Sequence, residues 1–111
     1  MQSRIEKIVN SLDKNKAESI EVFDLREKNY FVEYAIIASS LSSKHTTALL
    51  NHIKTDLKPT ETFVHVDESE DWVVIDLSDI LIHIMTPEYR VKYDMESFLT
   101  SLSDGKEGNT L

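Results

Sequence analysis

Two carboxylates, Asp76 and Asp79, lie three residues apart inside a stretch rich in valine and isoleucine. Paired carboxylates can bind Mg²⁺ together with a phosphate-bearing substrate, so this pair is a candidate metal site. Such a site also needs a basic side chain to stabilise the phosphate charge, and the sequence shows none near the pair. We therefore expect the two aspartates to straddle a turn without holding a metal.

Histidines and serines around a predicted helix offer two further candidates. His45 and His52 are seven residues apart and lie on similar sides of that helix, but no third ligand stands at metal spacing. The serines between positions 39 and 43 precede the helix at a strand-to-helix turn, where a nucleophile could be presented. No glycine flanks them to allow the strained turn of a nucleophile, so capping by Ser42 or Ser43 is the better interpretation.

The composition removes other kinds of chemistry. The chain has no cysteine, which excludes disulfides, thiolate nucleophiles and cysteine-based zinc sites. Its two glycines lie within residues 105–111, so no glycine-rich loop can cradle a phosphate. His83 sits in a predicted strand, where a histidine is more often structural than a catalytic base. The sequence therefore predicts no catalytic residue, no metal and no cofactor.

The element that positions Asp76, Asp79 and His83 is the best defined in the sequence. Two apolar runs, 72–77 and 80–85, are separated only by Ser78-Asp79, which predicts a β-hairpin with a two-residue turn. Side chains alternate across a strand, so the register places six aliphatic residues on one face, which suits a core: Val73, Ile75, Leu77, Ile80, Ile82 and Ile84.

The opposite face of the hairpin is mixed. The predicted register sets Trp72 opposite Met85, Val74 opposite His83 and Asp76 opposite Leu81. Tryptophan, methionine and histidine interrupted by a carboxylate suggest a surface that contacts a partner. The alternative interpretation is that a helix covers this face and the polar tips reach its edge, and the sequence leaves both open.

Hydrophobic periodicity predicts the remaining elements. Helices are expected over residues 3–14, from Ser42 or Ser43 to Pro59, as a turn within 87–93, and after Asp94. Further strands are expected near residues 20–25, 34–38 and 63–66, the last two joined by a right-handed parallel crossover.

The resulting fold class is a single α/β domain, residues 1–103, with a mixed sheet of about five strands and about three helices. Residues 104–111 are expected to form a flexible acidic and polar tail. Helices on one face only would leave the other face of the sheet partly open, which favours the contact-surface interpretation.

The charge favours one class of partner. The formal net charge is −8, and acidic residues gather just before the hairpin: Glu61, Asp67, Glu68, Glu70 and Asp71. An acidic domain is repelled by phosphates, so little or no direct nucleic-acid binding is expected and a basic protein partner is favoured. The alternative is a solvated loop. No apolar run reaches the length of a membrane span and no signal core begins the chain, so a cytoplasmic location is expected.

A series of motifs resembles the ribosomal silencing factor S, or Iojap, family over roughly residues 3–100. The matching segments are Asp24-Leu-Arg26, Glu33-Tyr-Ala-Ile-Ile-Ala-Ser39, Ser42-Ser-Lys-His45, Trp72-Val-Val-Ile-Asp76, Asp79-Ile-Leu-Ile-His83, Pro87-Glu-Tyr-Arg90 and Tyr93-Asp94. The chain departs from the family pattern at Glu33, where aspartate is usual, and at Ser40 and Ser78, where glycine is usual.

The resemblance implies a fold similar to the nucleotidyltransferases without their catalytic motif. Those enzymes need a Gly-Ser turn and an Asp-x-Asp pair, whereas this chain has Ser39-Ser40 and no Asp-x-Asp. The resemblance further implies a factor that binds ribosomal protein L-fourteen on the large subunit, blocks joining of the small subunit and represses translation. The alternative function is a small nucleotidyltransferase or nucleotide-binding enzyme, and a homodimer is a further interaction to consider.

The hairpin and the segment after it form the predicted partner-binding site. Paired strands place Trp72 beside Met85, and the chain then runs directly into Pro87-Glu88. Tryptophan and arginine often dominate interface energies, methionine adapts to irregular surfaces, and carboxylates can pair with a basic protein. The predicted site residues are Trp72, Asp76, His83, Met85, Pro87, Glu88 and Arg90.

Overall fold

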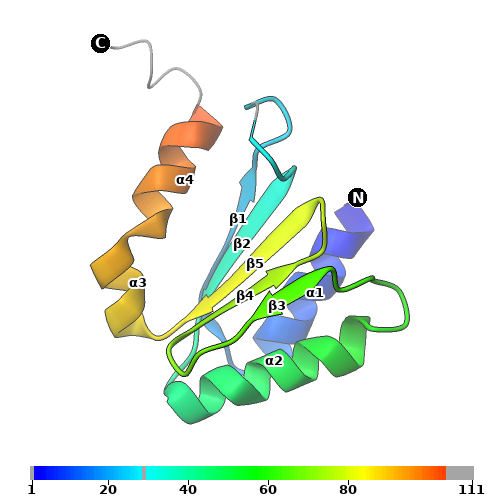
Figure 1. The fold of residues 1–111 in the computed structure, drawn as a ribbon, viewed down its shortest axis with the longest axis vertical. Coiled ribbons are helices and arrows are strands. Elements are labelled where there is room, and N and C mark those ends of the chain that lie inside the picture. Colours follow the sequence, from blue (N-terminus) through cyan, green and yellow to red (C-terminus); the bar gives the residue numbers. More distant parts are fainter. Residues whose placement is uncertain (1, 29, 105–111) are drawn as a thin grey trace.

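The computed structural model describes residues 2–28 and 30–104, which form four helices and five strands (Figure 1). The helices are α1 Gln2–Lys14, α2 Ser43–Leu57, α3 Pro87–Tyr93 and α4 Met95–Asp104. The strands are β1 Glu18–Asp24, β2 Tyr34–Ser39, β3 His65–Asp67, β4 Trp72–Asp76 and β5 Ile80–Met85.

Two boundaries differ from the sequence-based expectation. Residues 87–93 form a helix of their own, which is followed by Asp94 in a left-handed conformation, so the described residues form one helix more than expected. The last strand before the hairpin begins at His65 rather than at residue 63. Residues 105–111 of the expected tail lie outside the described residues, and Asp104 is the last residue of α4.

The five strands form one mixed sheet in the order β1-β2-β5-β4-β3, which confirms the predicted fold class. The hairpin of β4 and β5 has the predicted register, with Val73 paired to Ile84 and Ile75 to Ile82. β5 also pairs in parallel with β2, and β3 pairs antiparallel with β4. β3 therefore runs parallel to β2, as expected for the segment that crosses over through α2.

Helices cover both faces of the sheet, which corrects the expectation of helices on one face (Figure 1). On one face, α1 and α2 pack against the aliphatic side of the hairpin and against β2. On the other face, Leu99 of α4 is buried against a second apolar cluster from β1, β2 and β5 that includes Phe23, Ile37 and Leu81. On that face the β4 residues Trp72, Val74 and Asp76 are half-exposed, and His65 and Asp67 of β3 beside them are exposed. A helix thus covers one part of the face and leaves the part at β4 and β3 open, so each interpretation describes one part of it.

The strand β2, which is apolar except for Ser39 at its end, lies where its composition predicts. All six of its residues are buried, because the sheet continues on both sides of it and helices pack on both faces. Strands buried on both faces lack alternation in their sequence, which is the pattern of Tyr34–Ser39. None of the described helices is both long enough and apolar enough to cross a membrane.

The hairpin turn closes without the glycine that the resemblance leads one to expect. Ser78 adopts a φ of 82°, in the left-handed region that favours glycine. Its backbone N–H donates to Oδ1 of Asp76 at 2.7 Å, and the N–H of Leu77 donates to the carbonyl of Ile80 at 2.9 Å. The Asp76 carboxylate thus compensates part of the strain at Ser78.

Replacing Ser78 with glycine should raise the free energy of unfolding by about 0.5–1 kcal/mol, since relief of the left-handed strain exceeds the entropic cost of glycine. Chemical denaturation of the Ser78→Gly variant measures this. The control is Ser101→Gly in α4, at an exposed helical position where glycine should lower stability instead. A loss of stability in Ser78→Gly would show that the turn is unstrained.

Candidate partner-binding surface

Four ring side chains from β4, β5 and α3 meet at one end of the sheet. The indole Nε1–H of Trp72 donates a hydrogen bond to Nδ1 of His83 at 3.0 Å, and the two ring centroids are 5.9 Å apart. The Trp72 ring also contacts Tyr93 of α3, and the two ring centroids are 5.1 Å apart. Tyr89 lies 5.5 Å from Tyr93, one helical turn before it. We call these four residues the Trp72 cluster.

His83 is the buried member of the Trp72 cluster, with 4% of its surface exposed. Burial lowers its pKa from 6.5 to about 4, so the ring is neutral at physiological pH. Because Nδ1 of His83 accepts the hydrogen bond from the indole N–H, the single N–H of the neutral imidazole is on Nε2. That Nε2 atom is buried without a hydrogen-bond partner among the described residues.

The structure separates the predicted site residues into two groups. The side chains of His83, Met85 and Arg90 are buried, so within this fold they support other groups. Trp72 and Asp76 are half-exposed, and Pro87 and Glu88 are exposed at the start of α3. Trp72 and Asp76 stand at opposite ends of β4, and the Asp76 carboxylate is engaged with the hairpin turn.

Arg90 fastens α3 to three other elements. Its guanidinium donates two hydrogen bonds of 3.0 Å to Glu96 of α4, one of 2.9 Å to Oγ of Ser39 and one of 2.7 Å to the carbonyl of Ser19. A second carboxylate, Glu21, lies 3.6 Å away. The hydrogen bond to Arg90 lowers the pKa of Glu96, whereas contact with Glu96 raises the pKa of Glu21. Arg90 thus holds the backbone that presents the Trp72 cluster.

An acidic segment borders the Trp72 cluster. Asp67 is exposed at the end of β3, and Glu68 and Glu70 are exposed in the connection between β3 and β4. Asp71 fixes this connection, because its side chain accepts a hydrogen bond from Oγ of Ser43 at 3.1 Å and its carbonyl accepts one from the backbone N–H of Thr86 at 3.0 Å. The acidic segment therefore runs directly into Trp72, which joins it in sequence to the Trp72 cluster.

The two carboxylates of the candidate metal pair, Asp76 and Asp79, form hydrogen bonds within the protein: Asp76 with the backbone of Ser78 and Asp79 with Arg4. Arg4 of α1 donates to both oxygens of Asp79 at 2.7 and 2.9 Å and to both oxygens of Glu61 at 2.8 Å, so the expectation that no basic group lies near the pair is wrong. The hydrogen bonds from Arg4 lower the pKa of Asp79. The described residues contain no cluster of metal-ligating side chains. This network ties α1 to the hairpin turn.

The histidine and serines at the start of α2 have structural partners. Ser42 is the N-cap, as expected, and its Oγ accepts from the backbone N–H of His45 at 3.1 Å. The His45 ring joins two elements, since Nδ1 accepts from the N–H of Leu41 at 2.8 Å and Nε2 lies 2.8 Å from the carbonyl of Asn15. These contacts give Ser42 and His45 structural roles at the start of α2.

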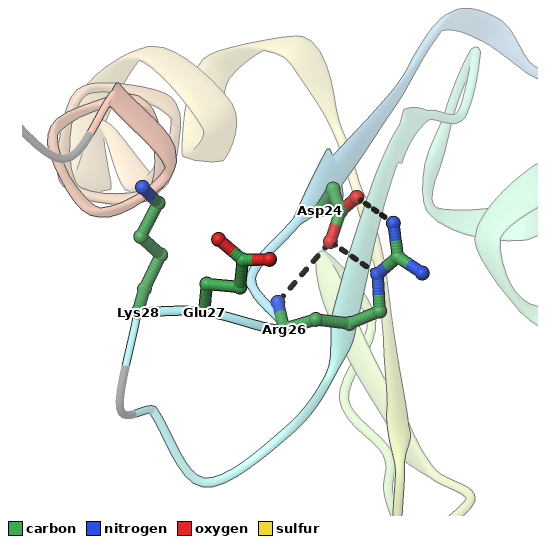
Figure 2. Close-up of a pocket in the computed structure, with 4 residues that line it drawn as sticks. All are labelled: Asp24, Arg26, Glu27 and Lys28. Carbon is green, nitrogen blue, oxygen red and sulfur yellow. Dashed lines mark hydrogen bonds and ion pairs between the residues drawn. The ribbon is translucent and has the colours of Figure 1, made fainter.

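A shallow hollow of about 280 Å³ lies in the loop after β1, lined by Asp24, Arg26, Glu27 and Lys28. Figure 2 shows Arg26 folded back onto Asp24, which accepts two side-chain hydrogen bonds, of 2.9 and 2.6 Å, and one from the backbone of Arg26 at 3.1 Å. Lys28 points away from this pair. The charged side chains of the Asp24-Leu-Arg26 motif therefore pair with each other and stabilise the turn after β1.

Sequence reasoning missed Tyr89 and Tyr93 as members of the site. A signal for them exists, because residues four apart on a helix lie on one face, where two aromatic side chains can contact each other. Tyr93 is 47% exposed, and Lys92 adds a cation 5.4 Å from its ring. The exposed part of the surface is therefore more aromatic than predicted.

Comparison with known proteins gives concordant results. Residues 1–109 match the family described as "Ribosomal silencing factor during starvation", RsfS. The chain is 34% identical to the ribosomal silencing factor RsfS of Zymomonas mobilis over 80% of this chain and 69% of that protein. Identity to RsfS of Haemophilus influenzae is 32%, over 83% and 93% of the two chains. A crystal structure of a Chromobacterium violaceum protein has a TM-score of 0.82 at 27% identity, covering 88% of this chain and 84% of that one.

Proposed function

Because the chain belongs to the ribosomal silencing factor (RsfS) family, we propose that it binds the large ribosomal subunit and sterically blocks association with the small subunit. The partner on the large subunit is ribosomal protein L-fourteen, and the outcome is repression of translation in the cytoplasm. A steric mechanism needs a docking surface and no catalytic group.

The Trp72 cluster and the acidic segment beside it are the proposed docking surface. The observation that carries this assignment is the contact of half-exposed Trp72 with Tyr93, whose ring centroids are 5.1 Å apart, close in sequence to the exposed carboxylates of Asp67, Glu68 and Glu70. Aromatic side chains anchor interfaces, and a negative rim steers a basic protein toward them. Pro87 and Glu88 extend the surface along the exposed start of α3.

The buried residues of the predicted site serve this surface indirectly. Arg90 fixes α3 to the sheet, and Met85 is fully buried at the end of β5 beside Trp72. Their replacement would weaken binding by displacing Tyr93 or Trp72. Contact with the partner is assigned to Trp72, Tyr93, Pro87, Glu88 and the acidic segment.

Replacing Trp72 with alanine should weaken binding to purified large subunits about thirtyfold, which corresponds to about 2 kcal/mol for a central aromatic anchor. Glu88→Lys should also weaken binding, by repelling a basic partner. Binding is measured by co-sedimentation with large subunits, and the same samples are tested for inhibition of subunit joining.

The matched control is Phe31→Ala, which removes an aromatic ring that is 68% exposed in the loop between β1 and β2. This variant should bind normally. Circular-dichroism melts separate lost contacts from lost folding. Folded Trp72→Ala and Glu88→Lys variants with wild-type affinity would place the docking surface elsewhere on the domain.

A further inference from the structure

His83 is an unfavourable residue for the space that it occupies. Its neighbours across the two adjoining strands are Ile37 and Val74, and its Nε2–H lies buried without a partner. Leaving a buried donor unpaired costs about 1–3 kcal/mol, which an apolar ring at the same position would avoid. Packing alone therefore does not account for a histidine here.

The histidine supplies one thing that an apolar ring cannot, which is an acceptor for the indole of Trp72. The Nε1–H of Trp72 reaches Nδ1 of His83 at 3.0 Å, while Tyr93 contacts the Trp72 ring from the neighbouring helix. Trp72 is half-exposed, so without the acceptor its indole N–H could bond to water and the ring could turn outward. Burial keeps the His83 ring neutral, as accepting this bond requires.

We infer that His83 is a positioning residue for partner binding, whose Nδ1 holds the Trp72 indole in the orientation that docks. This inference rests on the proposed function for its effect on affinity, but the hydrogen bond itself can be tested in the isolated protein. His83 touches no partner in this arrangement and acts only through Trp72.

The first test uses the isolated protein. Trp72 is the only tryptophan in the chain, so the amide NMR spectrum contains one indole N–H signal, and the intrinsic tryptophan fluorescence has one source. In the wild type this N–H should exchange with solvent slowly, and in His83→Phe it should exchange at least tenfold faster, with a shifted emission maximum. A wild-type indole that exchanges as fast as free tryptophan would overturn the inference without any variant.

The second test is a double-mutant cycle with large subunits. His83→Phe should weaken binding about tenfold in the wild-type background and by less than twofold in a Trp72→Phe background, where no indole N–H remains to be held. A purely structural role for His83 would weaken binding equally in both backgrounds, which would contradict the inference. Wild-type affinity in folded His83→Phe would contradict it as well.

Two controls keep the outcome readable. If His83→Phe does not fold, His83→Leu also removes the acceptor while keeping an apolar side chain at this position. If the wild type does not bind large subunits at all, the proposed function fails, whereas the indole exchange experiment still decides whether His83 orients Trp72.

Discussion

Replacing Arg90 with alanine should lower the free energy of unfolding by about 3–5 kcal/mol, because removal of a buried cation leaves its partners uncompensated. The Arg90 side chain is only 7% exposed and bonds to Glu96, Ser39 and the carbonyl of Ser19. Domains of this size are stable by about 5–15 kcal/mol, so the loss is a large share of the total. Chemical denaturation followed by circular dichroism measures it.

Arg26 provides a matched control for Arg90. It makes a comparable bidentate bond to Asp24, but the two side chains are 56% and 49% exposed. Exposed ion pairs contribute about 0–1 kcal/mol, so Arg26→Ala should change stability little. Equal losses in the two variants would mean that burial of the Arg90 network is energetically unimportant.

Lowering the pH from 7 to 4 should cost about 3 kcal/mol of stability through His83 alone. The folded protein holds the pKa of His83 at about 4 by burial, whereas the unfolded chain has the ordinary value of 6.5. Between these two values the unfolded state binds the proton and the folded state does not, so acid favours unfolding. The contribution of neutral His83 to the free energy of unfolding is fully present above pH 6.5 and is lost as the pH falls toward 4.

The measurement compares wild type with His83→Phe. Both proteins contain the same other histidines and carboxylates, so the difference between their stability–pH curves isolates His83. We expect the variant to lose about 3 kcal/mol less than the wild type between pH 7 and pH 4. Parallel curves for the two proteins would show that His83 titrates normally in the folded state.

The hairpin could be predicted from sequence in full, including its register. A two-residue turn fixes which residues face each other, and the aliphatic face then has to be the buried one. The structure pairs Trp72 with Met85 and Val74 with His83 as this reasoning requires. The core stripe of α2 followed from its helical spacing for the same reason, with Leu49, Leu50 and Ile53 all buried.

The contacts that position the site could not be predicted, because each joins segments far apart in the sequence. Arg4 meets Glu61 and Asp79 only once α1 is packed on the sheet. Arg90 lies in a seven-residue helix, too short for a periodic pattern to reveal that its charged side chain points inward. Sequence spacing therefore located the strands and placed Arg90 in the site, but it did not show that Arg90 is buried or that Arg4 binds Asp79.

The position of β5 in the sheet bears on how the chain folds. β5 is the last of the described strands in chain order, yet it lies between β2 and β4, with Tyr34 paired to Ile80. Until β5 is in place, the pair β1–β2 and the pair β3–β4 are not connected by any strand pairing. Pairings between distant segments slow folding, because the intervening chain must lose entropy before it gains contacts. During synthesis the pairing of β2 with β5 can therefore be complete only after residue 85 has left the exit tunnel.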